Sequence, residues 1–292
     1  MSNAPISVVL TTYNDSEYLA DAIDSIFNQK LLPKQLIVVD DGSDSDESNI
    51  ITSRYMDNNK KITVLYFKKE NGGVSSARNL GIKHVSQPYI SFIDADDRML
   101  KDNLELKYNS LSVLNDNYFG VYGSAVTSKD NHHDFRNIDG IISTSLVGFY
   151  NSGIPGGCPY YLFRTKSIVD VGGFDDSLSN NEDFDIIIRM IMKNQSCKGV
   201  VGRSVLITVR ENSLSRDTDY YKVFNNIMKF IDKAEKNNFF SKRHLNKRKS
   251  IAHLFLAKRV FYKNPIKATS LVVKAVLYTK NPYDLYRIYN ER

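Results

Sequence analysis

The chain is predicted to be an α/β protein whose mostly parallel sheet is covered by helices on both faces. Along its first half, short runs rich in Val, Ile and aromatic residues alternate with longer segments in which apolar residues recur at helical spacing. Parallel strands need a crossover connection, which is usually a helix. The alternation therefore predicts right-handed β–α–β units and a sheet that is buried on both sides.

The expected elements follow one another closely up to residue 114. The first strand is predicted over Ile6 to Leu10, and a helix begins near Ser16. One face of this helix is apolar, with residues at helical spacing: Leu19, Ala22, Ile23, Ile26 and Phe27. The other elements of this half are strands over 35–39, 62–67 and 89–94, a polar helix between the second and third strands, and helices over 74–85 and 102–114.

After residue 114 the pattern of strands and helices is less regular. Strands are predicted over 119–126 and 160–163, with a turn over 171–175. The segment from Gly153 to Cys158 is either a substrate-lining loop or a plain connection. A helix starts at Asn181, and acidic residues in its first turn, Glu182 and Asp183, are explained by capping alone in one interpretation.

Polar or glycine-rich segments directly follow four of the predicted strands: Thr11–Asn14, Asp40–Ser43, Gly72–Gly73 and Asp94–Asp97. Because the carboxyl ends of parallel strands lie along one edge of a sheet, these segments are expected to converge there and form a nucleotide pocket. Turn chemistry explains any single one of them. Four on one edge favour a binding site.

The run Tyr89-Ile-Ser-Phe-Ile-Asp94-Ala95-Asp96-Asp97 is the centre of this prediction. It is a buried strand that ends in three carboxylates. Carboxylates at a strand end suit a hard cation such as Mn²⁺ or Mg²⁺, with phosphate oxygens completing its shell. The alternative interpretation is an ordinary acidic turn.

Composition predicts a cytoplasmic protein, with peripheral attachment to the inner face of the cytoplasmic membrane as an open alternative. Two cysteines, Cys158 and Cys197, form no disulfide framework and no zinc pattern. The amino terminus has no signal-peptide pattern, and no apolar run approaches the ~18 residues of a spanning helix.

Charge divides the chain into two parts. From Asp219 to Arg292 there are 17 Lys and Arg residues against 5 Asp and Glu, whereas residues 1–218 hold 22 basic and 28 acidic side chains. We therefore expect a catalytic domain over residues 1–216 and a basic helical region over 217–292, with Pro265 and Pro282 separating helical segments.

The basic region admits three interpretations. Its apolar faces pack on the catalytic domain with the charges solvated, or residues 240–292 contact an anionic membrane surface, chiefly through 242–244 and 247–249. Nucleic-acid binding is the third, and it is predicted to be absent because the aromatic residues are periodic and form no stacking platform.

With these motifs in place, the sequence resembles family 2 glycosyltransferases of the GT-A fold, a Rossmann-like class, over about residues 5–216. The resemblance rests on segments in the family's order: Val8-Val-Leu-Thr-Thr-Tyr-Asn14, Val38-Val-Asp-Asp-Gly-Ser43, Gly73-Val-Ser-Ser-Ala-Arg-Asn-Leu-Gly81, Asp94-Ala95-Asp96, and Gly172-Gly-Phe-Asp175 followed by Glu182-Asp183. Many members carry a histidine near the position of Glu211-Asn212, so a third metal contact is left open here.

The resemblance implies an inverting, metal-dependent transfer from a nucleotide-diphosphate sugar, expected to be a UDP-sugar. The acceptor would be a hydroxyl of a glycan or lipid-linked acceptor in surface polysaccharide or capsule biosynthesis. Asp183 is the implied catalytic base, and Asp96, of the DXD motif, is the implied ligand of Mn²⁺ or Mg²⁺. The implied donor-binding residues are Thr11, Tyr13, Asp40, Arg78, Asp94, Ala95 and Arg210, although Arg78 and Arg210 are equally explained as structural ion-pair partners.

Two alternatives from other classes remain at this point. A receiver-like binding module would use Asp40, Asp41 and Asp94 to hold Mg²⁺. A metal-dependent nucleotidyltransferase of similar fold would release pyrophosphate in place of a nucleoside diphosphate.

Overall fold

The computed structural model describes residues 3–57, 61–127, 141–142, 156–193, 195–209 and 219–279. The described residues up to Val209 form one compact unit, and those from Asp219 onward form a second. The predicted domain boundary at residue 216 lies outside the described residues, as do Arg210 and Pro282.

The first unit is built on one mixed sheet. Its described strands are β1 (Ala4–Thr12), β2 (Pro33–Asp40), β3 (Thr63–Lys68), β4 (Tyr89–Asp94), β5 (Arg98–Met99), β6 (Tyr118–Thr127), β7 (Ile141–Ile142), β8 (Tyr161–Arg164) and β9 (Ser196–Ile207). They are ordered β3-β2-β1-β4-β8-β6-β9-β5, and β7 pairs with β9. The first four are mutually parallel, β6 and β9 are also parallel, and β8, β5 and β7 run antiparallel to their neighbours.

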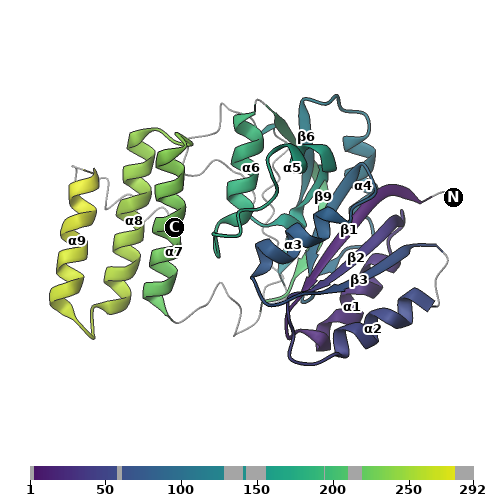
Figure 1. The fold of residues 1–292 in the computed structure, drawn as a ribbon. Coiled ribbons are helices and arrows are strands. Elements are labelled where there is room, and N and C mark those ends of the chain that lie inside the picture. The colour runs from purple at the N-terminus through teal and green to yellow at the C-terminus, as the bar shows by residue number, and fades with distance from the viewer. Residues whose placement is uncertain are drawn as a thin grey trace. The chain divides into compact units, whose positions relative to one another are not determined.

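Helices cover both faces of the parallel half, as predicted (Figure 1). The described helices of this unit are α1 (Ser16–Phe27), α2 (Glu47–Asp57), α3 (Val74–Lys83), α4 (Asn103–Leu111), α5 (Thr165–Asp170) and α6 (Glu182–Met192), with a 3₁₀ turn, η2 (Cys158–Tyr160). Side chains alternate along β1, so Val8 packs with α1 and α4 while Val9 faces α3. At Gly81 an added Cβ would lie 2.4 Å from Val9 Cγ1, which explains why α3 carries glycine there.

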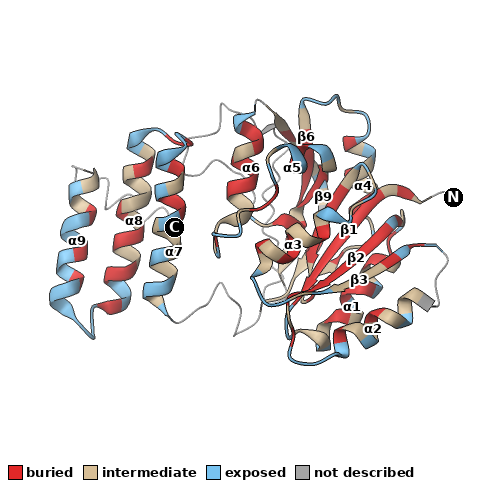
Figure 2. Ribbon diagram, viewed as in Figure 1, coloured by how far each residue is buried: buried red, intermediate tan, exposed pale blue. Residues whose placement is uncertain are grey.

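The register of the sheet decides which residues meet at its carboxyl edge. Thr11 of β1 lies opposite Asp94 of β4, and Thr12 lies opposite Asp40 of β2. These strands are almost completely buried up to that edge (Figure 2). The polar residues that follow the strands are therefore held next to one another by backbone pairing.

Some elements were not predicted. The two-residue strand β5 exists only through its antiparallel pairing with β9, which is more than 100 residues away in sequence. The six-residue helix α5 is too short for a helical period to be visible. The predicted polar segment after residue 127 and the beginning of the loop from Gly153 lie outside the described residues.

The second unit consists, in its described part, of the helices α7 (Tyr220–Lys236), α8 (Lys242–Val260) and α9 (Pro265–Thr279). Helix α8 packs against both α7 and α9, and Pro265 opens α9 at a position where its missing N–H costs nothing. The side chains buried between these helices include Phe230 and Ile231 of α7, Leu256 and Val260 of α8, and Leu271 of α9. In the described part of the chain, no helix combines the length and apolar character needed to cross a membrane.

Candidate active site at the carboxyl edge of the sheet

The turn that follows β4 is fixed to both neighbouring strands. The Thr11 hydroxyl donates to Asp94 Oδ1 at 2.7 Å, and the Ala95 amide donates to the Thr11 carbonyl at 2.9 Å. The Asp97 amide closes the turn onto the Asp94 carbonyl, and Asp97 Oδ1 accepts from the Thr208 amide at 3.0 Å. The acidic turn is therefore held rigidly between β1 and the end of β9.

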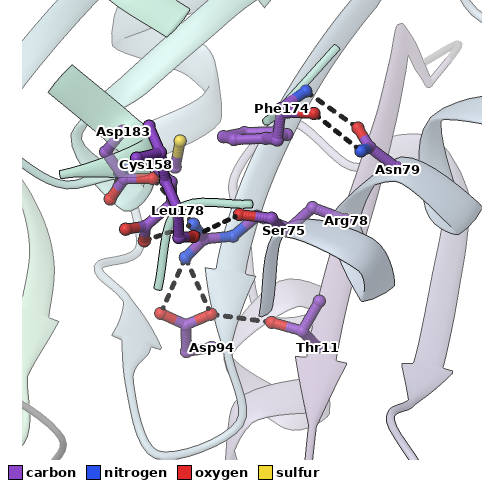
Figure 3. Close-up of polar contacts among 10 residues, drawn as sticks. Thr11, Ser75, Arg78, Asn79, Asp94, Cys158, Phe174, Leu178 and Asp183 are labelled. Carbon is purple, nitrogen blue, oxygen red and sulfur yellow. Dashed lines mark hydrogen bonds and ion pairs between the residues drawn. The ribbon is translucent and has the colours of Figure 1, made fainter. Parts of the chain in front are cut away.

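One guanidinium connects this turn to α6. Arg78, on α3, is only 3% exposed, and its Nη2 lies 3.2 Å from both carboxylate oxygens of Asp94. Its Nη1 lies 2.7 Å from Asp183 Oδ1 and 3.3 Å from Glu182 Oε1 (Figure 3). The guanidinium packs on the Phe174 ring, with Arg78 Cζ 5.4 Å from the ring centroid. Asp94 and Asp183 thus share one buried cation.

Asp183 occupies the first turn of α6, and both of its oxygens are directed toward other elements. Oδ1 accepts from Arg78, and Oδ2 accepts from the backbone amide of Cys158 at 3.0 Å. Asn181, just before the helix, has a left-handed φ of 63°, which turns the chain sharply into the site. These contacts give Asp183 partners beyond the helix terminus, so they exceed what capping alone predicts.

Electrostatics in this cluster favour a charged arginine and a protonatable glutamate. Burial opposes the charge on Arg78, but the carboxylates of Asp183, Asp94 and Glu182 raise its pKa well above the ordinary value. Burial, followed by the charge of Asp183, raises the pKa of Glu182 to about 7, and Arg78 offsets this in part. Burial and Asp183 likewise raise the pKa of the Cys158 thiol, which disfavours a thiolate nucleophile here.

Asp40 ends β2 and is completely buried. Its Oδ1 accepts from the Ser43 amide at 2.7 Å, and its Oδ2 accepts from the Tyr66 hydroxyl at 3.0 Å. The Asn14 amide in turn donates to the Ser43 hydroxyl, which joins the loops after β1 and β2. Tyr13, at the end of β1, is exposed. Asp40 therefore shapes the predicted base pocket, and Tyr13 presents its ring at the same edge.

Asp41 orders the loop between β3 and α3. It accepts from Lys69 Nζ at 2.6 Å and from the amides of Gly72 and Gly73 at 3.0 and 2.7 Å. Gly73 has a φ of +86°, a conformation that side chains rarely adopt. Through these partners, Asp41 fixes the loop that leads into α3, the helix that carries Arg78.

The acidic turn has the donor type that Mg²⁺ or Mn²⁺ prefers. Arg78 engages both oxygens of Asp94, and the half-buried Asp96, two residues further along the same turn, is the carboxylate that the sequence predicts to hold a metal. Within the described ranges there is no group of three His, Cys, Asp or Glu side chains placed to hold an ion. The set fits a cation held by one carboxylate, with substrate phosphates and water completing its shell. Arg210, the remaining predicted residue, lies outside the described residues.

Two supporting contacts were missed by sequence reasoning. The Asn79 side chain donates to the Phe174 carbonyl at 2.9 Å and accepts from the Phe174 amide at 2.8 Å, so it clamps the glycine turn next to Arg78 (Figure 3). The sequence signal that could have identified Asn79 is its position next to Arg78 in the segment from Gly73 to Gly81. The Cys158 amide, which binds Asp183, carries no sequence signal because any residue supplies a backbone donor.

Comparison with known proteins gives a consistent result. A family model described as glycosyl transferase family 2 matches residues 7–169. An uncharacterized glycosyltransferase of Rickettsia bellii is 32% identical over 188 residues, which cover 62% of this chain and 26% of the relative. The minor teichoic acid biosynthesis protein GgaB of Bacillus subtilis is 43% identical over 105 residues, which cover 35% of this chain and 11% of that protein. The matches span between 26% and 58% of the length of the Rickettsia relatives.

Two solved structures illustrate the likeness in fold. S. aureus TarS 1–349 in complex with UDP has a TM-score of 0.60 at 17% identity, and the match covers 98% of this chain and 91% of that one. The mannosyltransferase PcManGT from Pyrobaculum calidifontis, in complex with GDP-Man and Mn²⁺, has a TM-score of 0.63 at 15% identity, with 99% and 84% covered. At this identity the likeness concerns the fold alone, and it confirms the predicted fold class.

Proposed function

Because the chain belongs to glycosyl transferase family 2, we propose that it transfers a sugar, with inversion, from a nucleotide-diphosphate donor to an acceptor hydroxyl. The donor site lies at the edge formed by Thr11, Tyr13, Asp40 and Asp94. The acceptor is activated at Asp183. Membership of this family favours the transferase over the receiver-like and nucleotidyltransferase alternatives.

The observation that carries the proposal is the contact of one buried guanidinium with both Asp94 and Asp183. Arg78 places the carboxylate that would receive the acceptor's proton at a set distance from the turn that would hold the diphosphate. Such fixed placement lowers the entropic barrier of a two-substrate reaction. The described contacts of Arg78 favour the ion-pair interpretation of this residue, and direct diphosphate contact is kept as a secondary proposal.

In the proposed step, Asp183 takes the proton of the acceptor hydroxyl as that oxygen attacks the anomeric carbon. The bond from the anomeric carbon to the phosphate oxygen breaks, and its electron pair leaves with the nucleoside diphosphate. Each carboxylate oxygen has two acceptor positions, so the contacts with Arg78 and Cys158 leave Asp183 room for a hydroxyl. The positive charge of Arg78 stabilises the Asp183 carboxylate beside it, and this ion pair forms without the acceptor.

A divalent cation, Mn²⁺ or Mg²⁺, bound by Asp96 would neutralise charge on the departing diphosphate. The Ala95 amide and the Thr11 hydroxyl shape the turn that presents Asp96. We assign Asp40 and Tyr13 to the nucleotide base, and Arg210 to the diphosphate.

The finer proposal is a UDP-sugar donor and a glycan or lipid-linked acceptor in surface polysaccharide biosynthesis. Its support comes from similar proteins. Solved structures of similar fold are complexes with UDP, UDP-GlcNAc or GDP-Man, and one relative is named for teichoic acid biosynthesis. Both nucleotide types therefore belong in the test.

The test is calorimetric titration of the full chain with UDP, GDP and their sugars, with and without Mn²⁺. We expect metal-dependent binding of one nucleotide that Asp96→Ala abolishes. The matched control is Asp116→Ala, an exposed carboxylate away from the edge, which should bind as the native protein does. Binding that is insensitive to both metal and Asp96→Ala would overturn the metal assignment, and absence of nucleotide binding would overturn the donor site.

Once a donor is identified, the anomeric configuration of the product tests the displacement step. A single displacement predicts inversion and release of a nucleoside diphosphate. A product with retained configuration would contradict the role of Asp183.

A further inference from the structure

Helix α9 has two apolar faces, and only one of them is covered. Ala268, Leu271 and Ala275 are buried against the neighbouring helix. On the other side, Ile266, Val273 and Leu277 are 84%, 51% and 69% exposed. An isolated exposed apolar residue is common on a protein surface. Three on one helix, opposite its buried face, form a pattern that the packing of the unit does not explain.

The exposed residues form a straight stripe. Residues 266, 270, 273 and 277 follow one another at spacings of four, three and four, and at about 100° per residue they fall within about 60° of one another. We call Ile266, Ser270, Val273 and Leu277 the α9 stripe. It runs for about 17 Å at a rise of about 1.5 Å per residue. Every member of the stripe is exposed.

Lysines border the stripe on one side. Lys267 and Lys274 lie about 70–90° around the helix from the centre of the stripe, and both are exposed. Lys267 Nζ lies 4.3 Å from the centre of the Tyr221 ring, so its ammonium makes a cation–π contact with α7. Lysines in this position extend their charges past an apolar face toward a polar layer beyond it.

The turn between α8 and α9 adds two exposed aromatic residues. Phe261 and Tyr262 contact each other edge to face with centroids 5.5 Å apart, and Tyr262 is 94% exposed. Lys263 follows directly and is also exposed. Aromatic side chains next to lysines are typical of surfaces that lie at a membrane–water boundary.

The sign of the charge selects the partner. Between Ser241 and Thr279 the chain has ten Lys and Arg residues and neither Asp nor Glu. Part of the predicted contact cluster is occupied within the unit, because Arg248 stacks on Phe240 at 4.6 Å and Lys249 pairs with Glu235. Lys267 is engaged in the same way over the Tyr221 ring, so the exposed Lys263 and Lys274 carry the surface charge that accompanies the stripe.

We propose that the α9 stripe and the α8–α9 turn dock on the surface of an anionic phospholipid bilayer, with α9 lying in the plane of the membrane. Lysines 263 and 274 would reach the headgroup phosphates while the stripe enters the acyl boundary. An anionic bilayer would bury the apolar stripe and at the same time pair with the basic residues that border it. Docking would hold the enzyme at a surface that carries lipid-linked acceptors.

The test is co-sedimentation of the full chain with vesicles of phosphatidylglycerol and phosphatidylcholine in equal parts, compared with pure phosphatidylcholine. We expect binding to the anionic vesicles only, weakened by salt. The variant Ile266→Gln, Val273→Gln, Leu277→Gln should lower the partition coefficient about tenfold or more. Replacing Lys263 and Lys274 with Gln should remove about a fivefold factor per residue.

The matched control replaces three comparably exposed apolar residues of the other unit: Ile50→Gln, Val113→Gln and Val201→Gln, which are 54%, 80% and 63% exposed. Its vesicle binding should equal that of the native chain. Circular dichroism and the melting temperature verify that each variant is folded. Nucleotide binding should be the same in all of them, which separates this test from that of the transferase activity.

Three results would overturn the proposal. Equal binding of the stripe variant and the native chain to the anionic vesicles would refute the assignment to α9. Loss of a lipid-free dimer in that variant, with no vesicle binding by the native protein, would assign the stripe to a second copy of the chain. Salt-sensitive binding to duplex DNA with no binding to anionic vesicles would assign the basic border to nucleic acid.

Discussion

Arg78 Nη1 lies 2.7 Å from Asp183 Oδ1, in an ion pair whose cation is almost completely removed from solvent. The same guanidinium reaches Asp94 on the other side. A buried charge without its partners is costly, so the arrangement constrains three elements at once: α3, the end of β4 and the first turn of α6.

Replacing Arg78 should therefore damage both stability and turnover. Arg78→Met leaves Asp94, Glu182 and Asp183 without their shared cation, and we expect the free energy of unfolding to fall by about 3–5 kcal/mol. Arg78→Lys keeps the charge, but a point charge cannot span both carboxylates as the planar fork does. Lysine should recover most of the stability but little of kcat.

Urea unfolding and steady-state kinetics on both variants measure this split. Arg54→Met, which removes an exposed arginine of α2, is the control and should change neither quantity appreciably. If Arg78→Lys regained full kcat, the bridging geometry would have no role in turnover.

Asp183→Asn should separate chemistry from binding. The amide cannot accept the acceptor's proton, and loss of a general base typically lowers kcat by about 10²–10⁴. Nucleotide affinity should change little, since Asp183 lies on the α6 side of Arg78 and not on the strand-end turn. Asp170→Asn, at an exposed carboxylate of α5, is the matched control. A variant that kept native kcat would exclude Asp183 as the base.

Glu182 should make stability depend on pH near neutrality. Its pKa is raised from 4.5 to about 7 in the folded chain, chiefly by burial and then by the charge of Asp183. The folded state thus binds the proton more tightly than the unfolded state, and this contribution is complete below about pH 4.5 and is lost as the pH rises through about 7. Glu182→Gln, which does not titrate, should gain stability relative to the native chain over that interval, by on the order of 2 kcal/mol.

Urea unfolding at about pH 4.5 and about pH 8 measures the gain. The control is Glu17→Gln, at an exposed position of α1. A difference between Glu182→Gln and the native chain that stayed constant with pH would contradict the buried, protonatable glutamate.

Lys107 should show the opposite dependence. Burial lowers its pKa from 10.5 to about 7, and its ammonium donates to the Pro159 carbonyl at 3.2 Å. Below about pH 7 the folded chain must bury the charge, and this penalty disappears as the pH rises toward 10.5, where the unfolded chain also loses the proton. Lys107→Met should therefore stabilise the chain at about pH 6, by on the order of 3 kcal/mol, and much less at about pH 10.

Denaturant unfolding at the two pH values checks the sign, with Lys101→Met as the exposed control. A destabilised variant at both pH values would show that the bond to Pro159 outweighs the cost of burying the ammonium. Because Pro159 adjoins Cys158, which holds Asp183, kcat of this variant reports whether that bond also positions the base.

Much of the parallel half was predictable because its signals are local. Leu19, Ile23 and Ile26 repeat at helical spacing, and α1 begins and ends within a few residues of the prediction. Thr11, Asp40 and Asp94 were assigned to one edge because each ends a strand of a parallel sheet. The antiparallel pairing of β5 with β9 was not predictable, since it depends on partners far apart in the chain.

Sequence alone determined the order of strands and helices in the parallel half, the residues that end those strands and the basic character of the last helices, because period, composition and strand ends are local properties. Only the tertiary structure decided that Arg78 reaches Asp183, 105 residues later, and that burial shifts the pKa of Glu182. It also decided which face of α9 is covered, because both faces are apolar in sequence. The physical reason is the same in each case: pairing and burial depend on which segments pack together, and that choice is made by the whole sheet and its crossovers.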